Sequence, residues 1–151
     1  MKISSLQKAR YAYSPKLPGM LRHGIADICV KEGEATQSVA DQEKIKALFP
    51  NTYGEKEITF AKGTNTAPAK KQVVGVILSG GQAPGGHNVI CGLYDALKAT
   101  NKENVLYGFK NGPIGLIEDN YVIFDDEYID QYRNTGGFDI IGSGRTKLEA
   151  E

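Results

Sequence analysis

The sequence predicts an α/β fold built on a parallel sheet, and three features of its second half lead to this prediction. Residues 73–78 are a continuous, mostly β-branched apolar run without polar alternation, as in a strand covered on both faces. A glycine-rich turn follows, and residues 88–99 then show helical periodicity. A second apolar strand at 105–109 completes a strand–helix–strand unit, which we expect to be right-handed. The apolar stripe of the helix is expected to comprise Val89, Leu93, Ala96 and Leu97.

Shorter elements are predicted after residue 110. We expect a loop at 112–115, a strand at 121–124, a helix at 126–134 and a fourth strand at 138–141. Asp125 is of the type that caps a helix, and the acidic residues after it suit the positive end of the helix dipole. A helix start therefore explains this acidic cluster better than a metal site does.

The first seventy residues are polar and weakly periodic, so this part predicts an irregular, partly helical extension (1–70) ahead of a domain at 71–151. Helices are expected at 4–13 and at 41–49, where Pro50 stops the second one, and a short strand is expected at 57–60. Four short strands would leave a bare sheet edge, so we expect a fragment of a longer protein. The alternative is a small complete domain.

The composition narrows the function classes. Among the 151 residues, 18 Lys and Arg balance 18 Asp and Glu, which argues against a general attraction to nucleic acid or to an anionic membrane. The sequence has neither a membrane-length apolar run nor an apolar signal segment. Cys29 and Cys91 form no metal-binding spacing, and we expect a cytoplasmic protein with reduced thiols.

The segment at 80–88, which reads Gly-Gly-Gln-Ala-Pro-Gly-Gly-His-Asn, is here named the first glycine turn. Glycines allow backbone N–H groups to approach a ligand closely, and a helix N-terminus adds donors and partial positive charge. The turn follows the carboxyl end of a strand, where open α/β folds bind ligands. We therefore predict a phosphate site at Gly80, Gly81 and Gln82, with a plain tight turn as the alternative.

Three basic residues are candidates to complete this site. The second glycine turn, residues 142–145, follows the fourth predicted strand, so Arg145 and Lys147 are placed to reach the crevice beside Gly81. Arginine offers a bidentate fork to phosphate oxygens, and lysine offers a point charge. Lys110 ends the second strand on the same sheet edge. A solvated basic loop is the alternative for Arg145 and Lys147, and an ordinary surface lysine is the alternative for Lys110. His87 is expected to be a packing or capping residue without a catalytic partner.

Several motifs together resemble the phosphofructokinase family. Residues 74–88 are similar to its first strand and phosphate loop, and the Gly-Gln-Ala-Pro-Gly-Gly-His-Asn form is similar to the long, pyrophosphate-dependent branch. Residues 108–116 resemble the second strand and its loop. Residues 134–139 and 142–147 resemble the next two motifs in the same order. The resemblance covers essentially the whole chain.

This resemblance implies a three-layer, Rossmann-like parallel sheet of the phosphofructokinase type, present here in part. It implies phosphate transfer from pyrophosphate to the 1-hydroxyl of fructose 6-phosphate in glycolysis, with Mg2+, by a homo-oligomer. Gly81 would contact the donor and Arg145 would approach its phosphates. The family's metal-binding and catalytic aspartates lie in Gly-Gly-Asp-Asp and Thr-Ile-Asp motifs, which this chain lacks.

We therefore expect no catalytic or metal-binding residue in these 151 residues, and no activity from them alone. Two alternatives within the family are an ATP-dependent enzyme and a noncatalytic regulatory subunit. Outside the family, the alternative is a freestanding phosphate-binding module.

Overall fold

The computed structural model describes residues 3–24, 27–63 and 70–147, and the chain divides into two compact units. The larger unit combines Met1–Pro15 with Pro68–Glu151, and the smaller unit is Lys16–Ala67. Each unit is described by itself below. Among the described residues, no helix is both long and apolar enough to cross a membrane.

The larger unit contains a three-stranded sheet in the order β3 (Val73–Val76), β4 (Val105–Phe109) and β5 (Tyr121–Ile123). β3 and β4 are parallel, as predicted, with Val73 opposite Val105. β5 runs antiparallel to β4, so the sheet is mixed and the prediction of a purely parallel sheet is wrong here. The connection from β4 to β5 is too short for the crossover that a parallel pair requires.

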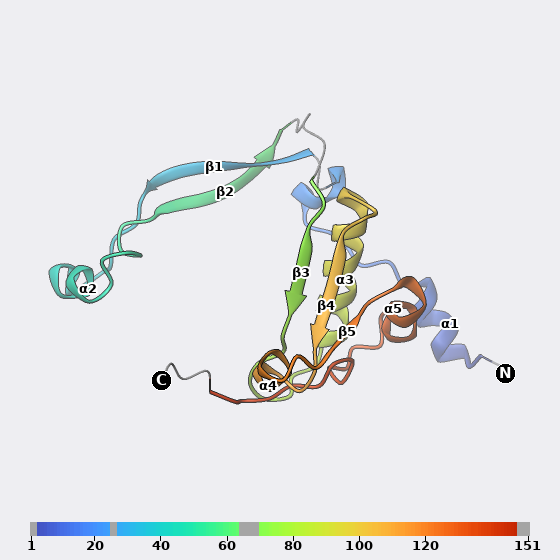
Figure 1. The fold of residues 1–151 in the computed structure, drawn as a ribbon. Coiled ribbons are helices and arrows are strands. Elements are labelled where there is room, and N and C mark those ends of the chain that lie inside the picture. Colours follow the sequence, from blue (N-terminus) through green and yellow to red (C-terminus); the bar gives the residue numbers. More distant parts are fainter. Residues whose placement is uncertain (1–2, 25–26, 64–69, 148–151) are drawn as a thin grey trace. The chain divides into compact units, whose positions relative to one another are not determined.

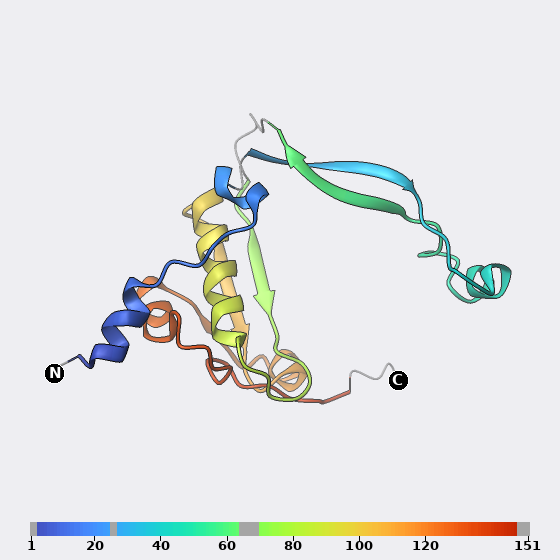
Figure 2. The same cartoon turned by 180° about the vertical axis from the view of Figure 1, so that it is seen from behind.

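Helix α3 (Gly86–Thr100) lies along β3 and β4 in both views (Figures 1 and 2). It joins these parallel strands, which confirms the predicted strand–helix–strand unit. Its buried stripe differs in part from the predicted one. Leu97 is buried as expected, whereas Val89 is 62% exposed. The helix instead buries side chains at i, i+3, i+4, i+7 and i+10 spacing, namely His87, Ile90, Cys91, Tyr94 and Leu97.

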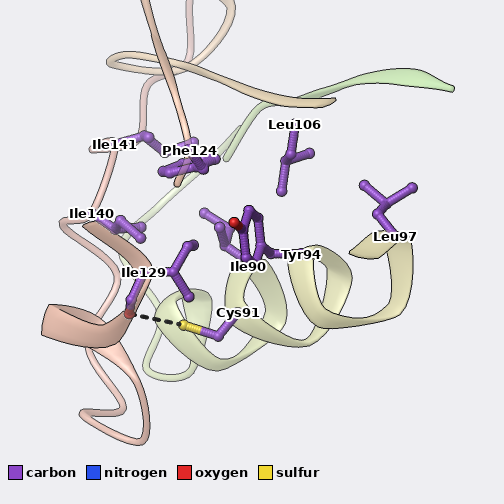
Figure 3. Packing of buried hydrophobic residues seen from close by; sticks show 9 residues of the cluster. All are labelled: Ile90, Cys91, Tyr94, Leu97, Leu106, Phe124, Ile129, Ile140 and Ile141. Carbon is purple, nitrogen blue, oxygen red and sulfur yellow. Dashed lines mark hydrogen bonds between the residues drawn. The ribbon is translucent and has the colours of Figure 1, made fainter. Parts of the chain in front are cut away.

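The core joins α3 to β4, to helix α5 (Asp126–Tyr132) and to the segment around residue 140 (Figure 3). Ile90 and Ile129 are 0% exposed, and Leu106 is 1% exposed. Burying each such side chain stabilises the fold by about 1.5–3 kcal/mol. The cluster comprises Ile90, Cys91, Tyr94, Leu97, Leu106, Phe124, Ile129, Ile140 and Ile141.

Two predicted segments have a different conformation. Residues 113–117 form a short helix, α4 (Pro113–Ile117), where a loop was expected, because proline suits the first position of a helix. Residues 138–141 form no strand. Their backbone groups form separate hydrogen bonds with distant partners in place of a strand ladder. The Ile140 N–H donates to the His87 ring, and the Ile141 carbonyl accepts from the Asn111 N–H.

Strand β3 is not covered on both faces, contrary to the prediction. Val74 and Val76 pack against the core, whereas Val73 is 66% exposed. β3 is the edge strand of this three-stranded sheet and pairs with β4 alone. One of its faces is therefore covered by α3, and the alternate residues face outward.

Side-chain hydrogen bonds cap helix α5 and hold the N-terminal segment of the larger unit in place. The Asp125 side chain accepts a hydrogen bond from the Tyr128 N–H at 2.8 Å, which confirms the predicted cap of α5. Helix α1 (Ser5–Ala12) confirms the first predicted helix. The Asn134 amide donates to the carbonyls of Arg10 (2.9 Å) and Tyr13 (3.2 Å), which holds this segment on the larger unit. The expected boundary between 70 and 71 stays a prediction.

The smaller unit contains the 3-10 helix η1 (Gly19–His23) and a two-stranded antiparallel sheet. Strands β1 (Ile28–Ala35) and β2 (Lys56–Lys62) pair with Val30 opposite Phe60, and helix α2 (Gln42–Leu48) lies between them in sequence. The predicted helix at 41–49 and strand at 57–60 are confirmed. β1 was not predicted, because its apolar residues Ile28, Cys29 and Val30 are followed by the exposed, largely charged stretch 31–34 without an alternating pattern.

Candidate functional site

The two glycine turns lie next to each other at the carboxyl end of β3. The Gly80 N–H donates to the Gly144 carbonyl at 2.8 Å, and the Gly144 N–H donates to the Leu78 carbonyl at 3.3 Å. Ser79 and Gly144 thereby form an isolated parallel bridge. The expected neighbourhood of the two turns is thus present, although a single bridge takes the place of the predicted fourth strand.

The segment that follows β4 completes this edge of the sheet. The Asn111 N–H donates to the Ile141 carbonyl at 2.7 Å. A Cβ atom on Gly112 would lie 2.5 Å from the Gly144 backbone nitrogen, and one on Gly142 would lie 2.7 Å from Asn111 Oδ1. Three segments distant in sequence therefore meet here, and glycine permits their close approach.

Arg145 reaches over the first glycine turn. Its Nη2 atom lies 3.0 Å from the position that a Cβ atom on Gly81 would occupy. Both residues are exposed, so the guanidinium and the glycine residue are each accessible to solvent. This arrangement offers planar charged donors beside an open main chain, which suits an anionic ligand with several oxygens.

The N-terminus of α3 contributes fewer free donors than the sequence suggested. The Gly85 N–H donates to the Gly136 carbonyl and the His87 N–H donates to the Gly137 carbonyl, each at 2.8 Å. These two groups hold the chain segment that leads toward the second glycine turn. The anion-binding capacity of the site therefore rests more on the loop at 79–82 and on Arg145 than on the helix end.

A cavity of about 390 Å³ opens beside the first glycine turn. Ser79, Gly81 and Ser143 contribute to its lining, together with the apolar side chains of Leu78, Val89 and Phe138. The exposed position of Val89 thus places it on this cavity, away from the core. The combination of an apolar wall and hydroxyl groups next to the Arg145 guanidinium can hold a small polar molecule with its charged end at the turn.

The structure groups only some of the predicted phosphate-binding residues. Gly80, Gly81 and Arg145 come together, and Gln82 follows them as an exposed residue. Lys110 and Lys147 are exposed, and neither lines the cavity. Sequence reasoning missed the contributions of Ser79, Ser143 and Phe138. The two serines flank glycines, which was the available signal, whereas nothing in the sequence marks Phe138.

Within the described ranges, no group of three or more His, Cys, Asp or Glu side chains is arranged to hold a metal ion. Cys29 and Cys91 are both free thiols.

Comparison with known proteins identifies relatives of the chain, although no family model matches it. It is 54% identical over 146 residues to a pyrophosphate–fructose 6-phosphate 1-phosphotransferase of Porphyromonas gingivalis, a match that covers 97% of this chain and 26% of that protein. It is 44% identical over 160 residues to the protein of the same name from Treponema pallidum, covering 100% of this chain and 28% of the relative.

A plant protein extends this set. The chain is 42% identical over 147 residues to the subunit beta 1 of the pyrophosphate–fructose 6-phosphate 1-phosphotransferase of Arabidopsis thaliana, covering 97% of this chain and 25% of that subunit. The chain spans about a quarter of the length of the curated relatives it matches. By this similarity along nearly all of its residues, the chain belongs to the family of the pyrophosphate-dependent phosphofructokinases.

Proposed function

We propose that the chain supplies the donor-phosphate site of an enzyme that transfers phosphate from pyrophosphate to the 1-hydroxyl of fructose 6-phosphate. The observation that carries this proposal is the position of Arg145 over Gly81, at the meeting point of the two glycine turns. The printed names of the relatives supply the substrates, since each is called a pyrophosphate–fructose 6-phosphate 1-phosphotransferase.

In this proposal the site acts by positioning and charge neutralisation, the two requirements of phosphoryl transfer. Backbone N–H groups around Gly81 and Gln82 bind the pyrophosphate oxygens, and the Arg145 fork binds two oxygens at once. The charge that develops on the departing phosphate is stabilised by the same guanidinium. Lys110 and Lys147 add positive charge at longer range, as lysine point charges near the turns.

The larger enzyme is proposed to have the three-layer, Rossmann-like sheet of the phosphofructokinase type and to act in glycolysis, in the cytoplasm, as a homo-oligomer. Mg2+ is proposed as the companion of pyrophosphate. Among the described residues, no group of three or more His, Cys, Asp or Glu side chains is placed to hold a metal ion. We therefore assign no step to the ion and expect the isolated chain to be inactive.

Calorimetric titration of this chain with pyrophosphate, and separately with ATP, tests the proposal. We expect pyrophosphate to bind, and we expect Arg145→Ala to weaken binding about tenfold, since a charge-assisted hydrogen-bonded pair is worth about 1.5–3 kcal/mol. Selective ATP binding would favour the ATP-dependent alternative. Binding that Arg145→Ala leaves unchanged would remove Arg145 from the site.

A coupled assay with pyrophosphate, fructose 6-phosphate and Mg2+ tests the expected inactivity. Clear turnover by this chain alone would contradict it. Tight, selective pyrophosphate binding without turnover in the natural full-length protein would favour a freestanding binding module or a regulatory subunit.

A further inference from the structure

His87 is a buried polar residue at the start of α3, directly after the first glycine turn. Its side chain is only 4% exposed, and its ring packs edge-on against Tyr132 with the ring centres 4.8 Å apart. A buried imidazole is costly unless both of its nitrogens have partners. The partners of its two ring nitrogens therefore indicate the role of His87.

Both ring nitrogens are engaged by one short segment. Nδ1 lies 2.6 Å from Thr135 Oγ1, and the Ile140 N–H donates to Nε2 at 3.1 Å. The Thr135 hydroxyl donates its single proton to the Tyr132 carbonyl at 2.5 Å. Toward the His87 ring the hydroxyl oxygen can therefore only accept, and it accepts from the Nδ1–H. Because a backbone N–H can only donate, Nε2 is the acceptor in its contact with Ile140. These two hydrogen bonds fit the tautomer that has its proton on Nδ1.

Asp139 defines the alternative protonation state. Its Oδ1 atom lies 2.7 Å from Nε2, and its side chain is 79% exposed. A proton on Nε2 would bond to this carboxylate and would deprive the Ile140 N–H of its acceptor. Only a ring whose Nε2 carries no proton can therefore accept from the Ile140 N–H.

The main chain of His87 also binds the segment at 135–140. The N–H of His87 donates to the Gly137 carbonyl at 2.8 Å, and a Cβ atom on Gly137 would lie 2.6 Å from the ring carbon Cε1. Glycine is thus required at 137 for the segment to pass so close to the imidazole. His87 consequently holds residues 135–140 on α3 through both its side chain and its main chain, beside the bond from the Gly85 N–H to the Gly136 carbonyl.

We propose that His87 is a positioning residue: it holds residues 135–140 on α3 and thereby places Arg145 beside Gly81. The segment it holds leads after five further residues to Arg145, and the intervening backbone is bonded to Leu78 and Asn111. With both nitrogens occupied, His87 takes no part in proton transfer. The inference rests on the proposed function, because Arg145 is taken as the ligand of the donor phosphate.

The test compares three side chains at position 87 by NMR and calorimetry. Phenylalanine keeps a ring but offers no nitrogen, whereas glutamine can place its amide oxygen near the Nε2 position and accept from the Ile140 N–H. We expect His87→Phe to speed hydrogen exchange of the Ile140 amide at least tenfold, by local opening, and to weaken pyrophosphate binding about tenfold. His87→Gln should restore most of both.

Two further variants distinguish a specific loss of positioning from general unfolding of the protein. Thr135→Val removes the acceptor of the Nδ1–H, together with the hydroxyl's bond to the Tyr132 carbonyl, and should give the same changes in weaker form. Ile129→Val loosens the core next to α3 and serves as the control for general destabilisation, so it should lower the melting temperature without changing pyrophosphate affinity.

A readout without ligand separates this inference from the proposed function. The nuclear Overhauser contact between the Arg145 side chain and the Gly81 α-protons should be present in the wild type and lost in His87→Phe. Its persistence in a folded His87→Phe variant would overturn the positioning role. If the wild type shows the contact but binds no pyrophosphate, the proposed function fails, and the loss of the contact in the variant still supports the role of His87.

Discussion

The guanidinium of Arg145 lies over the backbone of Gly81, with Nη2 3.0 Å from the point where a Cβ atom on that glycine would stand. Such a distance is tighter than ordinary van der Waals contact, so a side chain at position 81 would require the Arg145 guanidinium to shift by a few tenths of an ångström. The glycine therefore serves two purposes at once, leaving its own N–H accessible and leaving room for the cation. Substitution of Gly81 is consequently a direct probe of the proposed phosphate site.

We expect Gly81→Ala to weaken pyrophosphate binding about tenfold by displacing the guanidinium, as the loss of one charge-assisted contact would. The free energy of unfolding should change by less than about 0.5 kcal/mol, because only the far end of a flexible side chain has to move. Calorimetry and urea denaturation measure the two effects. Gly92→Ala is the control, since no atom lies within 4 Å of its added methyl. Unchanged pyrophosphate affinity in Gly81→Ala would contradict the arrangement.

The contact between Gly112 and Gly144 predicts a stability effect. Gly112 has φ +80° and a Cβ there would meet the Gly144 backbone nitrogen at 2.5 Å, whereas Gly136 has φ +74° and open space around it. A positive φ of this kind alone costs a side chain about 1–3 kcal/mol. We expect Gly136→Ala to lose about that much and Gly112→Ala to lose about 2 kcal/mol more, through overpacking. Equal losses in urea denaturation would show that the segment at Gly112 and the second glycine turn can separate freely.

The hydrogen bonds of Asn104, just after the C-terminal end of α3, lead to a second prediction about stability. Its side chain is 1% exposed, donates to the Leu97 carbonyl at 2.8 Å and accepts from the Gln72 N–H at 2.7 Å. Truncation leaves both backbone groups without this partner, so we expect Asn104→Ala to lower the free energy of unfolding by about 3 kcal/mol. The exposed Asn120→Ala is the control and should stay within about 0.5 kcal/mol of the wild type. A comparably small loss for Asn104→Ala would be incompatible with these contacts.

Tyr94 predicts a pH effect. Burial, followed by its 2.8 Å hydrogen bond to Asp126, raises the pKa of this phenol from 10.0 to about 12. The folded state therefore favours the protonated form, and this contribution to stability is complete below pH 10 and is lost as the pH rises through about 12.

Ultraviolet titration of tyrosinate in the folded protein should show one step near pH 12 that is absent in Tyr94→Phe. Tyr13→Phe changes an exposed tyrosine and should leave that step in place. If Tyr94→Phe removes a step near pH 10 instead, the bond to Asp126 is absent in solution.

Local sequence signals predicted the elements that depend on neighbouring residues. The helices at α1, α2, α3 and α5 and the parallel pair of strands follow from caps, periodicity and apolar runs. The signals failed where a distant partner decides the conformation. Residues 138–141 look like a strand, yet Ile140 and Ile141 enter the core while their backbone bonds to His87 and Asn111. Val89 looks like a core residue and instead lines the cavity.

The sequence by itself determined the family, the two glycine turns and the candidate cation Arg145, because glycine spacing after a strand and a basic residue after a second turn are local features. The tertiary structure alone decided that Arg145 stands over Gly81, that β5 is antiparallel and that His87 binds the segment at 135–140. These relationships join residues up to 64 positions apart (81 to 145), and their geometry comes from the packing of α3, β4 and α5 around one core.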